Sequence, residues 1–271
     1  MSQVHSLDDK VANLEGRLRS LGNVVIAFSG GADSAFLAAV SARVLGDASL
    51  AVTAISPSLA PEEEDDCRRL ALEWNLNWFA VHTDELADSK YSLNDGQRCF
   101  HCKSALMDAL EPIAEKHKAT VLLGVNVDDL GDHRPGQRAA GERDAVFPLV
   151  EAGFTKVEVR EVSRQLGLST ADKPAAACLA SRVPYGTPVT LGTLSSVAKA
   201  ETVLRNLGFN GLRVRHYGDT ARIEVEIGDL PKVVEQRQAI VDGVRTAGYA
   251  YVTVDLEGLR SGNLNAALAT S

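Results

Sequence analysis

The stretch that most constrains the fold is VVIAFSGGADSAFLAAV, residues 24–40. A short apolar run is followed by the turn Ser29-Gly30-Gly31, and apolar residues then recur with helical spacing. This pattern predicts a strand, a tight turn and the start of a helix, which together offer backbone N–H groups to an anion. The lysine of the pattern G-x-x-x-x-G-K-S/T is missing, so the turn is not a Walker-type loop.

Strands and helices alternate up to about residue 150. Short apolar runs predict strands at 23–28, 49–55, 77–82 and 119–125, and helical periodicity predicts helices at 33–46, 61–75, 100–117 and 155–167. Strands separated by helices of this length indicate a parallel, doubly wound sheet, so the expected fold class is α/β. The polar segment 126–146 follows the last of these strands, at the strand end where open α/β sheets bind ligands.

The pattern changes beyond about residue 187. A helix at 191–208 precedes two alternating strands, 212–217 and 221–227, and these are followed by a helix at 231–247 and a strand at 251–256. Alternation predicts a sheet with one covered and one exposed face, in a smaller C-terminal α+β domain. We therefore expect an α/β domain at 1–168, a connecting segment at 169–186 that carries Cys178, and the α+β domain at 187–271.

The composition is ordinary for a globular protein and restricts its partners. Hydrophobic residues make up 45% of the 271 residues, and the formal net charge of -8 argues against nucleic-acid binding. No apolar run approaches the roughly 18 residues that a membrane span needs, and the N-terminal segment lacks a signal-peptide core. We expect a cytoplasmic protein with neither a membrane nor a nucleic-acid partner.

The four cysteines are placed unevenly, and we do not expect them to form disulfides. Cys99 and Cys102 form a C-x-x-C pair, and Cys178 lies far downstream. Cys67 is expected to be a buried apolar side chain, because it shares a helical face with three apolar residues: Leu70, Ala71 and Trp74.

The turn S-G-G-x-D-S, from Ser29 to Ser34, resembles the signature of the PP-loop ATP pyrophosphatases. Glycine lets the backbone approach an anion closely, and the helix that begins near Asp33 adds its positive end. The resemblance implies that the turn holds the β,γ-pyrophosphate of ATP while the α-phosphorus is attacked to give an adenylate. The structural alternative is a glycine turn in which Asp33 or Ser34 caps the helix.

A second segment, FPLVEAGFTKVEVREVSRQLGL at 147–168, is similar to a segment of several PP-loop enzymes. Lys156 and Arg160 lie four residues apart on its expected helix, so they can point cations at phosphates from one face. The alternative is a solvated helix surface on which opposite charges pair.

Further segments resemble the LarE family, ATP-dependent sulfur transferases in the biosynthesis of the nickel-pincer nucleotide cofactor of lactate racemase. The resemblance covers nearly all residues from 13 to 265 and is carried by QRCFHCK (97–103), VNVDDLGDHRPGQRAA (125–140), KPAAACLASRVPYG (173–186), GLRVRHYGDTARIE (211–224) and LEGLRSGNLN (256–265). The turn alone specifies only the superfamily, whereas its combination with the segment around Cys178 is far more specific.

The resemblance implies a two-step reaction on a small substrate, a pyridinium dicarboxylate mononucleotide. ATP, with Mg²⁺, adenylates a ring carboxylate and releases pyrophosphate; a protein-held sulfur then displaces AMP, and repetition gives the bis-thiocarboxylate. It also implies a homo-oligomer, a hexamer by resemblance, and a possible sulfide donor system. The residues implied in ATP binding are Ser29, Gly30, Gly31, Asp33, Ser34, Asn126, Asp129, Lys156 and Arg160.

Three sources of sulfur remain open. In one branch of the family three cysteines carry a [4Fe-4S] cluster, and matching cysteines stand here at 99, 102 and 178. Three thiolates leave one iron of such a cluster free for a non-protein sulfur. In another branch Cys178 surrenders its own sulfur and becomes dehydroalanine. The third alternative is a zinc site completed by His101, or a plain redox pair.

Substrate contacts are expected in the C-terminal part of the chain. Arg213 and Arg215 alternate on a strand and can form a phosphate fork, and Arg182 follows Cys178 closely. Glu201 and Glu224 are metal-ligand candidates by loose resemblance. Exposed ion pairs are the alternative for all of these. Two rival functions are a PP-loop tRNA thiolase, disfavoured by the acidic balance, and a non-catalytic adenine-nucleotide-binding module.

Overall fold

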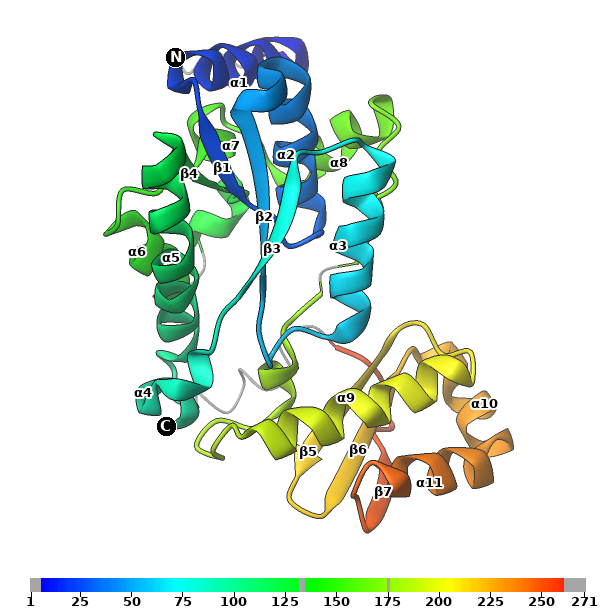
Figure 1. Cartoon of the computed structure of the whole chain (residues 1–271). Helices are drawn as coiled ribbons and strands as arrows, with labels where there is room; N and C mark the ends of the chain where they lie inside the picture. Colours follow the sequence, from blue (N-terminus) through cyan, green and yellow to red (C-terminus); the bar gives the residue numbers. More distant parts are fainter. Residues whose placement is uncertain (1–5, 132–134, 175, 261–271) are drawn as a thin grey trace. The chain divides into compact units, whose positions relative to one another are not determined.

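The computed structural model describes residues 6–131, 135–174 and 176–260, and the chain forms two compact units (Figure 1). The N-terminal unit comprises Met1–Ser56, Pro61–Asp84 and Cys99–Ala176. The C-terminal unit comprises Pro57–Ala60, Glu85–Arg98 and Ala177–Ser271. The domain boundaries expected from the sequence stay a prediction.

The N-terminal unit is built on a four-stranded parallel sheet in the order β3-β2-β1-β4, which confirms the expected α/β fold class. Because the chain moves from β1 outward to β3 and then returns to the other side of β1, the strand order reverses between β1 and β4. Ligands of doubly wound sheets bind at such a reversal, beyond the carboxyl ends of the strands. The strands are β1 (Val24–Ala27), β2 (Ser49–Ile55), β3 (Trp78–His82) and β4 (Thr120–Leu123).

Helices cover both faces of this sheet, because its central strands are apolar on both sides. Val24 and Ile26 of β1 join one core cluster with residues of α1, α2, α3 and α8, whereas Val25 joins another with residues of α5. The helices of the unit are α1 (Leu7–Leu21), α2 (Ala32–Leu45), α3 (Pro61–Glu73), α5 (Arg98–His117), α6 (Pro135–Gly141), α7 (Pro148–Glu151) and α8 (Lys156–Gln165), with 3-10 turns η1 (Gly46–Ala48) and η3 (Val127–Gly131).

Two helices begin with the same local device. The side chains of Ser6 and Thr155 each accept the backbone N–H of the residue three positions on, and that residue's carboxylate accepts the backbone N–H of the cap residue. The second of these carboxylates, Glu158, also receives the Lys10 ammonium at 2.8 Å. Lys10 thereby joins α1 to α8, and its bond to the Gly153 carbonyl adds the turn before α8.

The C-terminal unit has a three-stranded sheet in the order β5-β6-β7, antiparallel between the first two strands and parallel between the last two. Val214, Ile223 and Val225 face a core shared with α9 and α11. The sequence predicts a single helix at 231–247, but the structure divides it at Gln236, whose ψ of 12° departs from helical geometry. The elements are η2 (Glu85–Ala87), α4 (Ser89–Ser92), η4 (Leu179–Arg182), α9 (Leu191–Asn206), β5 (Leu212–Tyr217), β6 (Thr220–Val225), η5 (Ile227–Asp229), α10 (Leu230–Glu235), α11 (Arg237–Thr246) and β7 (Tyr251–Val254).

Among the described helices, none combines the length and the apolar character that crossing a membrane requires.

Close packing of α11 on α9 yields a stability prediction. A Cβ added at Gly243 would lie 2.4 Å from Cγ1 of Val203, whereas one added at Gly16, exposed on α1, would meet nothing within 4 Å. We expect Gly243→Ala to lower the free energy of unfolding by about 1–3 kcal/mol, because the stiff valine must move. Gly16→Ala should raise it by up to about 1 kcal/mol through helix propensity. Denaturant unfolding measures the free energy of unfolding of both variants. The prediction is contradicted if the two substitutions change it in the same direction and by the same amount.

Candidate active site

Backbone and side-chain contacts with β2 hold the residue directly before the turn between β1 and α2. Phe28 donates its N–H to the Val52 carbonyl at 2.8 Å and accepts the Thr53 hydroxyl at 2.7 Å. Gly30 then adopts a φ of 67°, and a Cβ there would lie 3.0 Å from Cys67 Sγ. A side chain at this position would therefore be strained twice, by its backbone conformation and by the thiol beneath it.

Helix α2 starts without a side-chain cap. Its N-cap is Gly31, so neither Asp33 nor Ser34 caps the helix. The Ser34 hydroxyl instead lies 3.0 Å from that of Ser29 and donates to the Gly31 carbonyl at 3.1 Å. An uncapped helix start with two hydroxyl groups beside it is a suitable anion-binding arrangement.

Two predicted residues, Asn126 and Lys156, contact the carboxylate of Asp33. Asn126 donates its amide to one carboxylate oxygen at 3.1 Å, and Lys156 donates its ammonium to the other at 2.9 Å. The Lys156 side chain is 37% exposed and that of Asp33 16%, so the pair lies at the surface of the turn rather than inside the core. A cation and a carboxylate are thus available beside the uncapped helix start.

The loop after β4 is shaped by Asn126, which is fully buried. Its side-chain oxygen accepts the N–H groups of Asp128 and Asp129 at 3.0 and 3.3 Å, and its own N–H is bound by the Asp129 carboxylate at 3.2 Å. Asp128 in turn accepts the N–H of Lys156 at 2.7 Å. The loop therefore holds both Asn126 and the start of α8 toward Asp33.

Gly124 is a residue that the motifs do not single out. A Cβ there would lie 2.7 Å from both the N and Cα atoms of Ser34, which real Cβ atoms essentially never do. The end of β4 therefore passes directly against the backbone of the α2 start. The sequence signal was available in retrospect, because Gly124 ends an apolar strand immediately before the polar loop.

Arg160, predicted to point at phosphates, has other partners in the structure. Its guanidinium donates to the carbonyls of Ala171 and Lys173, at 3.1 and 2.9 Å. Lys156 and Arg160 thus act on different segments although they lie on one helix. A phosphate contact from Arg160 stays a prediction.

Cys99 and Cys102 lie in the first turn of α5, where a separation of three residues places them on one face. Cys99 is exposed. The start of α6 packs closely here: a Cβ added to Gly136 would lie 2.9 Å from the Cys99 carbonyl, and Arg138 lies over the Phe100 ring. The segments 97–103 and 125–140 are therefore in contact, although Asp132, His133 and Arg134 lie outside the described residues.

Cys178 belongs to the C-terminal unit and is exposed, directly before η4. Arg182 organises this segment: it donates to the carbonyls of Ala177 and Cys178, at 2.7 and 3.3 Å, and forms a two-point ion pair with Glu201. Glu201 is fully buried and also accepts from Arg205 and from the N–H of Val214. Its oxygens are thus occupied by protein donors.

Arg213 and Arg215 share the face of β5 that points away from the core, as their alternation predicts. Arg215 donates to the Ser181 carbonyl and to Glu224, both at 2.8 Å, and Arg222 reaches the second oxygen of Glu224 at 3.1 Å. Burial, followed by the nearby Arg182 and Arg215, lowers the pKa of Arg213. The cations outnumber the two buried carboxylates, which favours an anion here. Part of the motif at 256–265, from residue 261 on, lies outside the described residues.

The donor set at 99, 102 and 178 suits a thiolate-bound cluster chemically, because all three are cysteines and Cys99 and Cys178 are exposed. Within the described residues, no group of three or more His, Cys, Asp or Glu side chains is gathered closely enough to hold a metal ion. Cys67 differs from the other three: it is fully buried in the core, as the sequence predicts, and burial raises its pKa to about 11.

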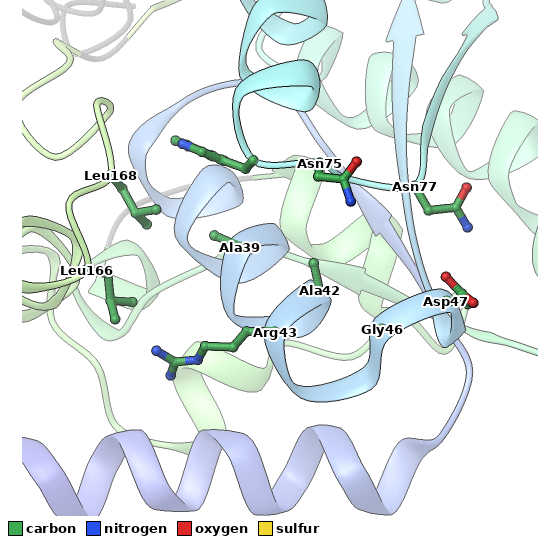
Figure 2. A pocket seen from close by; sticks show the side chains of 10 residues that line it. Ala39, Ala42, Arg43, Gly46, Asp47, Asn75, Asn77, Leu166 and Leu168 are labelled. Carbon is green, nitrogen blue, oxygen red and sulfur yellow. The ribbon is translucent and has the colours of Figure 1, made fainter.

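A pocket of about 420 Å³ lies at the other end of α2 from the turn (Figure 2). Arg43, Asp47, Asn75 and Asn77 bring polar groups to it, and the aliphatic wall includes two leucines: Leu166 and Leu168. None of the site residues predicted from the sequence is among those that line it.

Comparison with known proteins gives no matching family model, but three curated proteins align over most of the chain. An uncharacterized protein of Synechocystis sp. is 43% identical over 265 residues, which is 97% of this chain and 99% of that protein. The pyridinium-3,5-bisthiocarboxylic acid mononucleotide synthase of Lactiplantibacillus plantarum is 36% identical over 262 residues, or 96% and 95% of the two chains. An uncharacterized protein of Methanocaldococcus jannaschii is 28% identical over 239 residues, or 88% and 91%.

The Gly124 contact predicts a sharp effect on anion binding. Gly124→Ala should displace the start of α2, because the new Cβ would overlap the backbone of Ser34 rather than a flexible side chain. We expect a stability loss of about 1–3 kcal/mol and at least a tenfold loss of affinity for inorganic pyrophosphate, measured by calorimetry. Gly96→Ala is the matched control, since a Cβ there meets nothing within 4 Å. Unchanged pyrophosphate affinity in Gly124→Ala would contradict this role for the turn.

The cysteines should differ in reactivity. With a pKa of about 11, on the order of one Cys67 side chain in a thousand is a thiolate at pH 8, and it is also shielded from reagent. We expect iodoacetamide at pH 8 to alkylate Cys99 and Cys178 in the folded, metal-free protein while sparing Cys67. Raising the pH toward 11 should increase the thiolate fraction of Cys67, and unfolding the chain should expose its side chain. Either change should increase its alkylation. Peptide mass spectrometry measures each site, and early modification of Cys67 would refute its buried state.

Proposed function

Because the chain belongs to the LarE family of pyridinium-3,5-bisthiocarboxylic acid mononucleotide synthases, we propose that it is an ATP-dependent sulfur transferase that converts ring carboxylates of a pyridinium-3,5-biscarboxylic acid mononucleotide into thiocarboxylates. The observation that carries this proposal is the uncapped start of α2, with Asp33, Asn126 and Lys156 joined beside it. The substrate in this proposal is inferred from the named relative. The use of ATP is supported by the anion-binding geometry of the turn.

The first step is adenylation. The backbone N–H groups from Gly30 to Ser34 and the hydroxyl of Ser29 bind the β,γ-phosphates, and the positive end of α2 stabilises their charge. A carboxylate oxygen of the substrate attacks the α-phosphorus, and the bond from that phosphorus to pyrophosphate breaks. Lys156 neutralises phosphate charge as its ion pair with Asp33 is exchanged. Asp33 and Asp129 would hold Mg²⁺, which supplies charge neutralisation for the leaving pyrophosphate when bound.

The second step is sulfur transfer. A sulfur nucleophile attacks the acyl carbon, and the bond from that carbon to the AMP oxygen breaks, which leaves a thiocarboxylate. Arg213 and Arg215 bind the substrate phosphate in this proposal, with Arg182 holding the Cys178 segment. Two buried carboxylates hold two of these arginines in place at 2.8 Å: Glu201 pairs with Arg182, and Glu224 pairs with Arg215. A metal bound by either glutamate would have to compete with these arginines.

For the sulfur source we propose a [4Fe-4S] cluster held by Cys99, Cys102 and Cys178. Such a cluster would supply an exchangeable sulfide at the iron that no cysteine binds. Transfer of the sulfur of Cys178 itself is the alternative: its Cβ–Sγ bond breaks, the α-hydrogen is lost as a proton, and dehydroalanine remains. The chemistry also needs a sulfide donor system in the cluster route, and a homo-oligomer stays a family-based proposal.

The test is an anaerobic assay with ATP, Mg²⁺ and the dicarboxylate mononucleotide. We expect pyrophosphate, AMP and thiocarboxylate from the native chain. Cys99→Ala, Cys102→Ala and Cys178→Ala should each lose iron and sulfur transfer, while Cys67→Ala, the matched control, keeps its iron. Iron analysis and intact-mass spectrometry measure these outcomes.

Other results would redirect the proposal. Loss of about 34 Da at Cys178, with Cys99→Ala and Cys102→Ala still active, would replace the cluster by sacrificial transfer, since a thiolate leaves with its sulfur. ATP retained without pyrophosphate release would indicate a non-catalytic nucleotide-binding module. Tight tRNA binding that weakens steeply with salt would indicate a tRNA thiolase.

A further inference from the structure

The segment that leads into Cys178 is attached at several points to the N-terminal unit. Ser169 donates to Glu73 of α3 at 3.0 Å, and Arg164 of α8 pairs with Asp172 at 2.9 Å. Arg160 binds the carbonyls of Ala171 and Lys173, as described above. These contacts hold residues 169–173 between two helices.

Lys173 is the last and best shielded of these attachments. Its ammonium lies 2.7 Å from Glu63 and 2.8 Å from Asp66, both on α3, and its side chain is only 16% exposed. Burial opposes its charge, but the hydrogen bonds to Asp66 and Glu63 prevail and raise its pKa. The two carboxylates make the surroundings of Lys173 acidic. We therefore do not assign this lysine to the binding of a phosphate or a nucleotide.

Helix α3 also contacts the turn between β1 and α2, residues 29–34, which is the proposed phosphate site and is called the phosphate turn below. Cys67, next to Asp66 in sequence, turns its sulfur toward Gly30, so that one helix supports the turn and holds the lysine. Beyond Lys173, only five residues of chain lead to Cys178. At roughly 3.6 Å per residue, the covalent chain limits the separation of these two Cα atoms to about 18 Å.

We propose that Lys173 is a positioning residue for sulfur transfer: its ion pairs with Glu63 and Asp66 fix the segment before Cys178 to the helix that supports the phosphate turn. The inference rests on the proposed function but not on the sulfur source, because Cys178 takes part in both routes. Downstream of the cysteine, Arg182 and Arg215 hold the carbonyls of Cys178 and Ser181 within the C-terminal unit. In the sequence, Cys178 therefore lies between residues 169–173, which are attached within the N-terminal unit, and residues 179–182, which are attached within the C-terminal unit.

The two reaction steps should therefore depend differently on Lys173. Adenylation uses the turn and should not need Lys173, whereas sulfur transfer needs the thiol near the adenylate. Complete release of residues 169–173 would double the chain between the last attachment and Cys178 from five residues to ten; this is the upper end of the change in length, because Ser169, Asp172 and the carbonyls bound by Arg160 keep contacts of their own. Effective concentration falls with about the −3/2 power of length, which gives about a threefold loss, and poorer orientation adds to it.

The experiment measures thiocarboxylate formed per pyrophosphate released, using the full chain, ATP, Mg²⁺ and the dicarboxylate mononucleotide. Lys173→Met keeps the aliphatic stem and removes the charge; we expect this ratio to fall about twofold to threefold while the initial rate of pyrophosphate release stays unchanged. The double variant Glu63→Gln/Asp66→Asn should show the same fall, because it removes the other half of the attachment. Lys173→Arg should restore most of the ratio, and Lys116→Met, on the exposed end of α5, should leave it unchanged.

Each result decides between distinct explanations. An unchanged ratio in Lys173→Met, with normal pyrophosphate release, would overturn the inference and leave the proposed function intact. A fall in Lys173→Met without a fall in the double variant would also overturn it, because the lysine would then act on the substrate directly. If Lys173→Met does not fold, as judged by thermal melting, the double variant alone decides. Absence of pyrophosphate release in the native chain would instead refute the proposed function.

Discussion

The arrangement of the candidate site depends on one close contact, between the end of β4 and the start of α2. At Gly124 the two backbones approach so closely that a single added carbon would overlap Ser34. This contact brings the loop that carries Asn126 within hydrogen-bond distance of Asp33, and Asp128 then binds the start of α8. A strand end, a helix start and a second helix are thus linked at the reversal of strand order, where the field of α2 is strongest.

The elements were largely predictable because their burial is periodic in the sequence. The four parallel strands are apolar on both faces, and α1 and α8 carry complete capping boxes, so local preference and tertiary packing agree. The break at Gln236 was not predictable from periodicity, because the apolar spacing continues through it. Nor did the sequence indicate that 57–60 and 85–98 contribute to the C-terminal unit. Their role depends on long-range contacts: Ser58 accepts the N–H of Leu179 and Arg98 donates to the Ala180 carbonyl.

The candidate site was predictable only in part, for a related reason. Motif residues such as Asp33 and Lys156 were identified individually, and their ion pair follows from the fold. The charged residues of β5 and β6 were expected to lie on a sheet face, but not to be buried: Arg215 is 2% exposed and Glu224 is fully buried. A buried carboxylate of this kind is costly unless every oxygen is paired, and here two arginines supply the pairs. Alternation in a sequence indicates a face but not what covers that face.

The run of acidic residues at the start of α3 has a structural role. Its first residues after Pro61 are five consecutive acids, Glu62 to Asp66, a concentration that would ordinarily suggest a solvated surface. Acidic side chains are favoured at a helix start by its dipole, and the excess negative charge is then available to a buried lysine. Glu63 and Asp66, which bind Lys173, share a helix face with Cys67 and Leu70, whose side chains lie in the core, with the Cys67 sulfur close to Gly30 of the turn. One short stretch of α3 therefore carries both the carboxylates that bind Lys173 and the thiol that lies against Gly30. The acidic run thus gives α3 two roles within the N-terminal unit: it binds Lys173 of the segment that leads toward Cys178, and it supports the turn at Gly30.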